Sequence, residues 1–193
     1  MFINLVGDQL RRIPDDFVEL HASRLLLLIL GASEKTRKGV HSINSRVKIA
    51  KLDFFLRYPS YLEKALKILI SEGKLKGDTK VSADSLHSID PSMIRYHYGP
   101  WDKKYYNILN FLVAYNLISV KKNERGVDTF SLTKEGEEKA KILCTRENYK
   151  EIKDLSAIIG TIFGDWKGTT IKNFIYQHFP ELINLPLGTK IKP

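Results

Sequence analysis

The chain has 193 residues, of which 43% are hydrophobic, and a net charge of +9. This composition predicts a globular protein with a sizeable core and excludes a disordered chain. No apolar run reaches the roughly 20 residues that a membrane span needs, and the first residues lack the basic region of a signal peptide. We therefore expect a cytoplasmic protein with no membrane contact.

The single cysteine and the distribution of charge limit the possible sites. Cys144 alone excludes an intramolecular disulfide and a metal site with several thiolates. Positive charge favours partners that are rich in phosphate, but Lys and Arg are spread over both halves of the chain and form no basic tail. Charge alone therefore leaves nucleic-acid binding open.

The first predicted helix begins after Asp16, which forms a capping box with Glu19, and continues through an apolar run at residues 25–30 to Gly31. Because the second half of this helix is apolar on every side, we expect it to lie at the centre of the core. Residues 32–43 are polar and basic, which indicates a loop or a mobile insert.

A second helix is expected over residues 44–57, with Asn44 at its start and with Lys48 and Lys51 on its exposed side. Tyr58 precedes a proline, which disfavours the helical conformation and ends this helix.

A third helix is predicted from a capping box of Ser60 and Glu63 to Gly73. Its apolar side is expected to be buried and consists of Leu62, Ala65, Leu66 and Leu69. Residues 73–90 fit a short helix and a simple loop equally well.

Residues 96–141 have the pattern of one winged-helix unit. Asp102 can cap a helix whose apolar residues recur at the spacing of one helical face: Tyr105, Ile108, Leu109, Leu112 and Val113. Apolar and polar residues then alternate on both sides of the loop at 123–126, which predicts a β-hairpin. Thr133 can cap the helix that follows. The order helix, hairpin, helix is typical of the second half of a winged helix-turn-helix.

The last part of the chain predicts two more helices, whose apolar residues are Ile152, Leu155, Ile159 and Ile162 in one, and Ile171, Phe174, Ile175 and His178 in the other. The apolar segment 182–187 is expected to lie against its own domain or against a partner. The predicted fold class is mainly α with a small β-hairpin wing. A winged helix-turn-helix core with its N-terminal helices covers residues 1–145, and a C-terminal helical extension packed on that core covers residues 146–193.

The sequence contains no catalytic motif. It has no glycine-rich phosphate loop, no nucleophile elbow and no zinc-ligand spacing, and its five histidines are scattered. The best acid–base pair is His97 with Asp102, for which a turn residue and a helix cap are the simpler interpretation. We therefore expect no enzyme, no cofactor and no bound metal.

The helix at 105–116 is a candidate protein interface. Reading base edges in DNA requires Arg, Lys, Asn or Gln on the exposed face. Beyond Lys103 and Lys104 at its start, this helix offers only three asparagines, whereas it carries much aromatic surface. Large aromatic residues anchor protein interfaces, so we expect Trp101, Tyr105 and Tyr106 to form a docking face. The alternative is that Trp101 closes its own helix against residues 47–58.

Nucleic-acid contact is predicted at the hairpin tip and on the second helix. Lys121, Lys122 and Arg125, together with Lys48 and Lys51, can reach phosphates in a non-specific, salt-sensitive contact. A solvated hairpin edge, charged to prevent strand pairing, remains the alternative for the tip.

Three segments resemble the middle component of bacterial ABC three-component systems, which are similar to the Lamassu type of anti-phage defence. These segments are residues 51–59 (KLDFFLRYP), residues 93–102 (MIRYHYGPWD) followed by Tyr105 and Tyr106, and residues 132–136 (LTKEG) after the hairpin. The resemblance covers roughly residues 16–145. It implies a non-catalytic winged-helix subunit that binds an SMC/Rad50-like ATPase, alongside a separate effector subunit that is often a nuclease.

A second functional class stays open, in which the chain is a winged-helix DNA-binding transcription regulator. Such a regulator would dimerise through its outer helices and insert residues 105–116 into the major groove. The scarcity of basic side chains in that segment favours the docking subunit.

Overall fold

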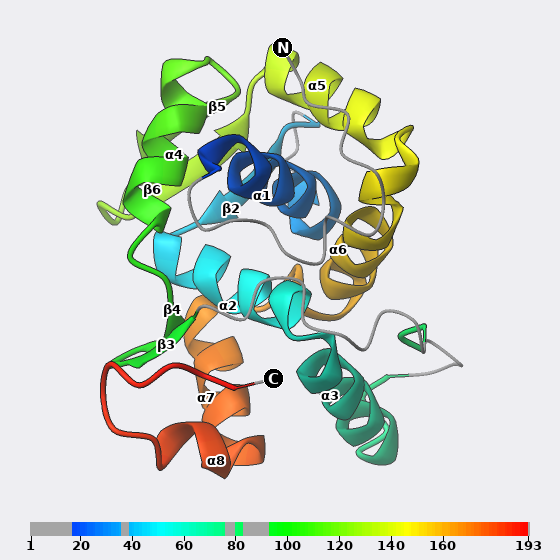
Figure 1. Cartoon of the computed structure of the whole chain (residues 1–193), viewed down its shortest axis with the longest axis vertical. Coiled ribbons are helices and arrows are strands. Elements are labelled where there is room, and N and C mark those ends of the chain that lie inside the picture. Colours follow the sequence, from blue (N-terminus) through cyan, green and yellow to red (C-terminus); the bar gives the residue numbers. More distant parts are fainter. Residues whose placement is uncertain (1–16, 36–38, 76–79, 83–92, 193) are drawn as a thin grey trace.

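We describe a computed structural model of the chain, which covers residues 17–35, 39–75, 80–82 and 93–192 (Figure 1). These residues form a mainly helical protein with a small antiparallel sheet of four strands and a separate pair of strands. None of the described helices is both long enough and apolar enough to cross a membrane.

The described elements follow in chain order. They are α1 (Val18–Ala32), β1 (Glu34–Lys35), β2 (His41–Asn44), α2 (Arg46–Arg57), α3 (Pro59–Ser71), β3 (Ile94–Tyr96), β4 (Gly99–Trp101), α4 (Tyr105–Ala114), β5 (Ile118–Lys122), β6 (Asp128–Leu132), α5 (Lys134–Cys144), the short 3-10 helix η3 (Glu147–Tyr149), α6 (Lys150–Phe163), α7 (Gly168–His178) and α8 (Pro180–Ile183).

Helix α1 lies at the centre of the core, as its apolar run predicted. Its residues 25–29 are buried, and α2, α4, α5 and α6 pack around it (Figure 1). The approach to α6 is close because small residues meet there: a Cβ atom added to Gly160 would overlap the carbonyl oxygen of Gly31. The long apolar helices thus share one continuous core.

The larger sheet has the strand order β1-β2-β6-β5. The predicted hairpin is confirmed as β5 and β6, in which Ile118 faces Leu132. Strand β2 joins the hairpin on its other side, where Ile43 faces Phe130. These four apolar side chains are buried, and β2 and β6 pack against α1.

Two predictions at the start of α2 are wrong. Residues 32–43 are not a loop throughout, because they contain β1 and most of β2. Asn44 belongs to β2, and the helix is capped by Ser45, whose Oγ accepts a hydrogen bond from the Lys48 backbone N–H at 3.1 Å. A four-residue strand of mixed polarity gives little periodic signal, and β2 is fixed by its pairing with distant β6.

Three further predictions concern the start of α3, the start of α1 and the buried face of α4. Helix α3 begins at Pro59 without a side-chain cap, so the capping box of Ser60 is not formed; the fixed φ of proline suits this first helical position. Asp16 lies outside the described residues, and Phe17 precedes α1 without a side-chain cap. On α4, Val113 is 44% exposed and not part of the buried face.

Other predicted features are confirmed. The expected apolar side of α3, formed by Leu62, Ala65, Leu66 and Leu69, is buried. Thr133 caps α5, since its Oγ1 accepts a hydrogen bond from the Gly136 backbone N–H at 2.9 Å. The two C-terminal helices are present as α6 and α7. Most of the undecided segment 73–90 lies outside the described residues.

The hairpin of β3 and β4 was not predicted. Its turn consists of His97 and Tyr98, and Gly99 and Pro100 lie in β4. Gly99 has a φ of +108°, a conformation that side chains of L-residues disfavour.

The C-terminal segment lies against its own domain, which is one of the two predicted alternatives. Leu182 is buried, and the following residues pair with β3 through backbone hydrogen bonds from Arg95 N–H to the Thr189 carbonyl and from Ile191 N–H to the Met93 carbonyl, both 2.8 Å. The hydroxyl of Tyr58 donates to the Ile191 carbonyl at 3.1 Å. The segment therefore holds the β3–β4 hairpin against the end of α2.

The close contact of α1 and α6 generates a stability prediction. Gly160→Ala places a methyl group against the Gly31 carbonyl and should destabilise the protein by about 1–3 kcal/mol, as overpacking does. The matched control is Thr161→Ala at the next, exposed position of α6, which should change the stability little. Urea unfolding measures both, and a Gly160→Ala protein at least as stable as wild type would contradict the close contact.

Candidate functional site

The structure brings together the three aromatic residues predicted as a docking face, but only one of them is open to solvent. The Trp101 ring centroid lies 5.2 Å from that of Tyr105 and 6.2 Å from that of Tyr106. Tyr106 is 52% exposed, Trp101 is half-buried and Tyr105 is 1% exposed. The prediction that Tyr105 belongs to the docking face is therefore wrong, because Tyr105 is buried.

Tyr106 is held in place from the neighbouring helix. The Arg46 guanidinium carbon lies 5.0 Å from the centroid of the Tyr106 ring, within the range of a cation–π contact. The same guanidinium reaches Asp128 of β6 at 3.4 Å. The starts of α2 and α4 and the loop end of the β5–β6 hairpin, where Asp128 pairs with Lys122, are thus connected at the surface.

Tyr105 points inward because it belongs to a buried ionic cluster of Arg24, Asp53, Arg57, Asp102 and Tyr105. Asp53 accepts hydrogen bonds from Arg24 at 2.9 and 3.2 Å and from the Tyr105 hydroxyl at 2.7 Å. Arg57 lies 3.7 Å from Asp53 and donates to Asp102 at 2.8 Å. Two guanidinium groups thus balance two carboxylates.

The cluster links elements that are far apart in the sequence. Arg24 lies on α1, Asp53 and Arg57 lie on α2, and Asp102 and Tyr105 lie at the start of α4. Burial and the neighbouring Asp53 charge raise the pKa of Tyr105 well above its ordinary value, so its hydroxyl remains a neutral hydrogen-bond donor. The cluster therefore fixes how α1, α2 and α4 pack together.

The suggested pair of His97 and Asp102 is not formed. Asp102 accepts hydrogen bonds from Arg57 and, at 2.9 Å, from the Lys104 backbone N–H in the turn before α4. The predicted Asp102 cap is wrong, because Lys104 is the N-cap residue and α4 has no side-chain cap. The His97 ring lies against Tyr96, with the centroids 5.2 Å apart. Across the described ranges, no group of three or more His, Cys, Asp or Glu residues is arranged to hold a metal ion.

Lys48 and Lys51 do not lie on an exposed side of α2, contrary to our prediction. They are 7% and 1% exposed, so neither is placed to contact a nucleic acid. Lys48 Nζ donates to the Gly164 carbonyl at 2.6 Å, and Lys51 Nζ donates to the Val47 carbonyl at 3.1 Å. The reason is that α6 and α7 cover this side of α2, a contact that the local sequence does not encode.

The hairpin tip carries three exposed cations, as predicted. Asn123 shapes the turn, because its Oδ1 accepts hydrogen bonds from the Arg125 and Val127 backbone N–H groups, each at 3.0 Å. Lys121, Lys122 and Arg125 project from the hairpin, and no carboxylate within the described residues forms an ion pair with them. This arrangement fits both a phosphate contact and a solvated edge.

Comparisons of the chain with protein-family models, with curated proteins and with solved structures gave no match in any of the three cases.

The buried ionic cluster generates a second prediction. Asp53→Asn leaves Arg24 and Arg57 without their shared carboxylate and should destabilise the protein by about 3–5 kcal/mol, because it leaves buried charge uncompensated. Tyr105→Phe is the control, since it removes a single hydrogen bond and should cost about 1–3 kcal/mol. Chemical unfolding monitored by circular dichroism measures the free energy of unfolding of both variants. An equal loss of stability in the two variants would contradict a central role for Asp53.

Buried Lys51 generates a prediction on pH. Burial, together with the charge of Lys172, lowers the pKa of Lys51 from 10.5 to about 8. Below pH 8 the folded protein carries the full cost of the buried ammonium, and this cost falls as the pH rises from 8 toward 10.5. Lys51→Met should therefore stabilise the protein at pH 7, and this gain should shrink by about 2 kcal/mol by pH 9.5. Urea unfolding at both pH values tests it, and a gain that does not change with pH would contradict the lowered pKa.

Proposed function

We propose that the chain is a non-catalytic winged-helix subunit of a cytoplasmic anti-phage defence complex. In this proposal it docks on an SMC/Rad50-like ATPase, links that ATPase to a separate effector such as a nuclease, and contacts DNA without reading its sequence. The sequence resemblance supports the identity of the partners, and the exposure of Tyr106 on α4 supports the docking face.

The strand pairing supports the winged-helix part of this proposal. In a winged helix, a strand that follows the first helix joins the hairpin that follows the third. Here β2 follows α1 and pairs with β6 of the β5–β6 hairpin, which follows α4. Helix α3 and the β3–β4 hairpin are then an insertion between the second and third helices of the unit.

The observation that carries the docking proposal is the outer face of α4. This helix contains no charged residue between Tyr105 and Ala114, and its exposed side chains are Tyr106, Asn107, Asn110, Val113 and Ala114. An exposed tyrosine with apolar neighbours is typical of a protein interface. A helix that inserts into the major groove reads base edges mostly with Arg, Lys, Asn or Gln. The exposed face of α4 offers only Asn107 and Asn110 and no cation, so the transcription regulator is less well supported.

The sequence motifs that carry the resemblance support a structural role for the chain. Asp53 and Arg57 come from the first motif, Asp102 from the second, and Tyr105 follows directly. All four belong to the buried ionic cluster, where Asp53 and Arg57 are fully buried and cannot reach a substrate. Motif residues that hold a fold together agree with a subunit that binds and does not catalyse.

The docking face is tested with Tyr106→Ala. Because Tyr106 is exposed, the variant should melt like wild type, yet it should weaken a complex with the SMC/Rad50-like ATPase encoded beside this chain by about 2 kcal/mol, or about 30-fold in Kd. Biolayer interferometry with the purified pair measures the effect. Trp101→Ala is a poorer test, since Trp101 also packs against the core.

Ile142→Ala is the matched control, because Ile142 on α5 is 51% exposed and equally apolar. It should leave the affinity unchanged. An unaltered Kd for Tyr106→Ala, or the lack of such an ATPase gene beside this chain, would refute the proposal.

A further inference from the structure

A second group of cations lies away from the hairpin tip, around the ring of Tyr176 on α7. The Arg95 guanidinium carbon lies 5.8 Å and the Lys172 Nζ lies 5.9 Å from the centroid of this ring. The Tyr176 hydroxyl donates a hydrogen bond to the His97 carbonyl at 3.2 Å, which ties α7 to the β3–β4 turn. We call Arg95, Lys172 and Tyr176 the Tyr176 cluster.

The cluster is built from elements that the fold holds firmly. Arg95 lies on β3, whose backbone is paired with the C-terminal segment through hydrogen bonds to Gly188 and Thr189. Lys172 and Tyr176 are one turn apart on α7, which packs against α2 and β4. Lys51 is close to this region, since a Cβ atom added to Gly99 of β4 would lie 3.9 Å from Lys51 Cε.

The positive charge of this region is not compensated within the described part of the chain. None of its carboxylates forms an ion pair with Arg95, Lys172 or Lys51, whereas the buried ionic cluster is balanced charge for charge. Arg95 Nε is buried without a hydrogen-bond partner, while its NH1 group donates to the Tyr96 carbonyl at 2.6 Å. The charge of Lys172 also contributes to the lowered pKa of Lys51. A bound anion would relieve this repulsion.

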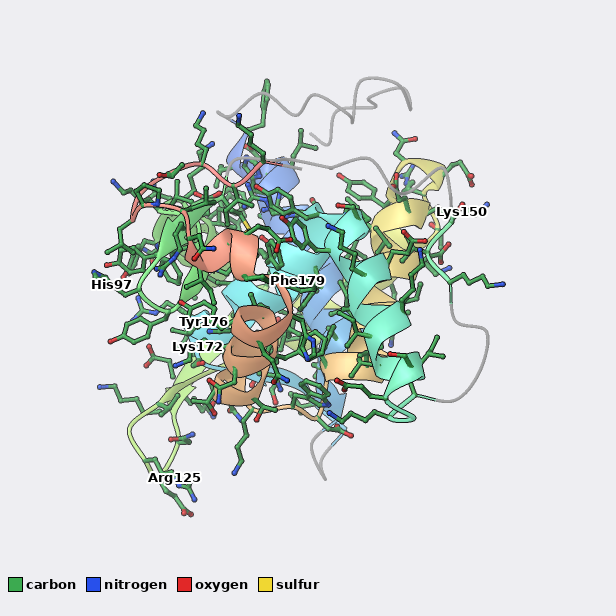
Figure 2. The ribbon with its side chains drawn as sticks, turned by 90° about the horizontal axis from the view of Figure 1, so that it is seen from below. His97, Arg125, Lys150, Lys172, Tyr176 and Phe179 are labelled. Atoms are coloured by element: carbon green, nitrogen blue, oxygen red, sulfur yellow. The ribbon has the colours of Figure 1, made fainter. Side chains whose placement is uncertain are left out.

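The chemistry of the cluster favours phosphate. Guanidinium and ammonium groups are the side chains that proteins use for phosphate. Arg95, Lys172 and Tyr176 are each partly exposed, so a ligand can reach the cluster from solvent. Figure 2 shows His97, Tyr176, Lys172 and the hairpin-tip residue Arg125 on one side of the molecule, with Lys150 on the opposite side.

We propose that the Tyr176 cluster binds the phosphate backbone of DNA, as a second contact on the same side as the hairpin tip. Arg95 and Lys172 each contact a phosphate, and the Tyr176 ring keeps both cations in position. The contact is independent of sequence, because no base edge needs to be reached. It does not depend on the proposed ATPase complex, since the outer face of α4 contributes no residue to it.

The test compares the salt dependence of DNA binding in matched variants of the full chain. Fluorescence anisotropy of a labelled duplex of random sequence is measured over a series of NaCl concentrations. In the variant with Arg95→Gln and Lys172→Gln, the slope of log K against log salt should decrease in magnitude by about 0.9 per lost phosphate contact, or about 1.8 in all. The control with Lys150→Gln and Lys153→Gln loses the same charge on α6 and should keep the wild-type slope.

A second variant separates lost contacts from lost structure. Arg95→Lys combined with Lys172→Arg retains both charges and should keep the slope close to wild type. The proposal is overturned if the glutamine pair keeps the wild-type slope, if the control pair loses as much, or if the charge-retaining pair loses as much as the glutamine pair. Calorimetry measures the binding of inorganic phosphate. The proposal is also overturned if phosphate binds to the wild type but not to the glutamine pair while the DNA slope of that pair stays unchanged, because the site then belongs to a free anion.

Discussion

The position of Asp53 between Arg24 and Arg57 is the constraint on which the rest of the structure depends. Removing two guanidinium groups and two carboxylates from water is costly, and the attraction between them repays this cost only in good geometry. Here Asp53 accepts three hydrogen bonds and Asp102 accepts two. A displacement of α1, α2 or α4 would leave one of these charges unpaired, so the buried ionic cluster favours a single arrangement of the three helices.

This arrangement decides which residues of α4 reach the surface. Because Tyr105 donates to Asp53 in the interior, the next residue, Tyr106, points outward toward Arg46. The uncharged outer face of α4 then follows from helical spacing, with Asn110 one turn further on. The interior cluster and the exposed face are thus two sides of one helix, and a change in the first would reorient the second.

Local patterns predicted those elements that local interactions define. The apolar period of α1 and α6, the hairpin of β5 and β6 and the Thr133 cap all arise from neighbouring residues. The cluster could not be predicted, because its hydrogen bonds between different helices join residues that lie 29 to 52 positions apart along the chain. The same reason explains the errors at Lys48 and Lys51: their charge predicts exposure, but α6 and α7, which cover them, come more than 90 residues later. Arg95 and Lys172 were missed because nothing in the sequence brings them to one tyrosine ring.

The surface charge separates two kinds of contact. The outer face of α4 carries no charged residue of its own, whereas cations lie at the tip of the β5–β6 hairpin and at the Tyr176 cluster. Apolar and aromatic surface stabilises a protein interface from which water is excluded. Cations bind phosphates, because this contact releases counterions. A protein docked on α4 therefore has no need to compete with DNA for the same side chains. The proposed subunit, which would connect an ATPase to DNA, would use this separation, whereas a groove-reading regulator, in which α4 itself would meet the bases, would not.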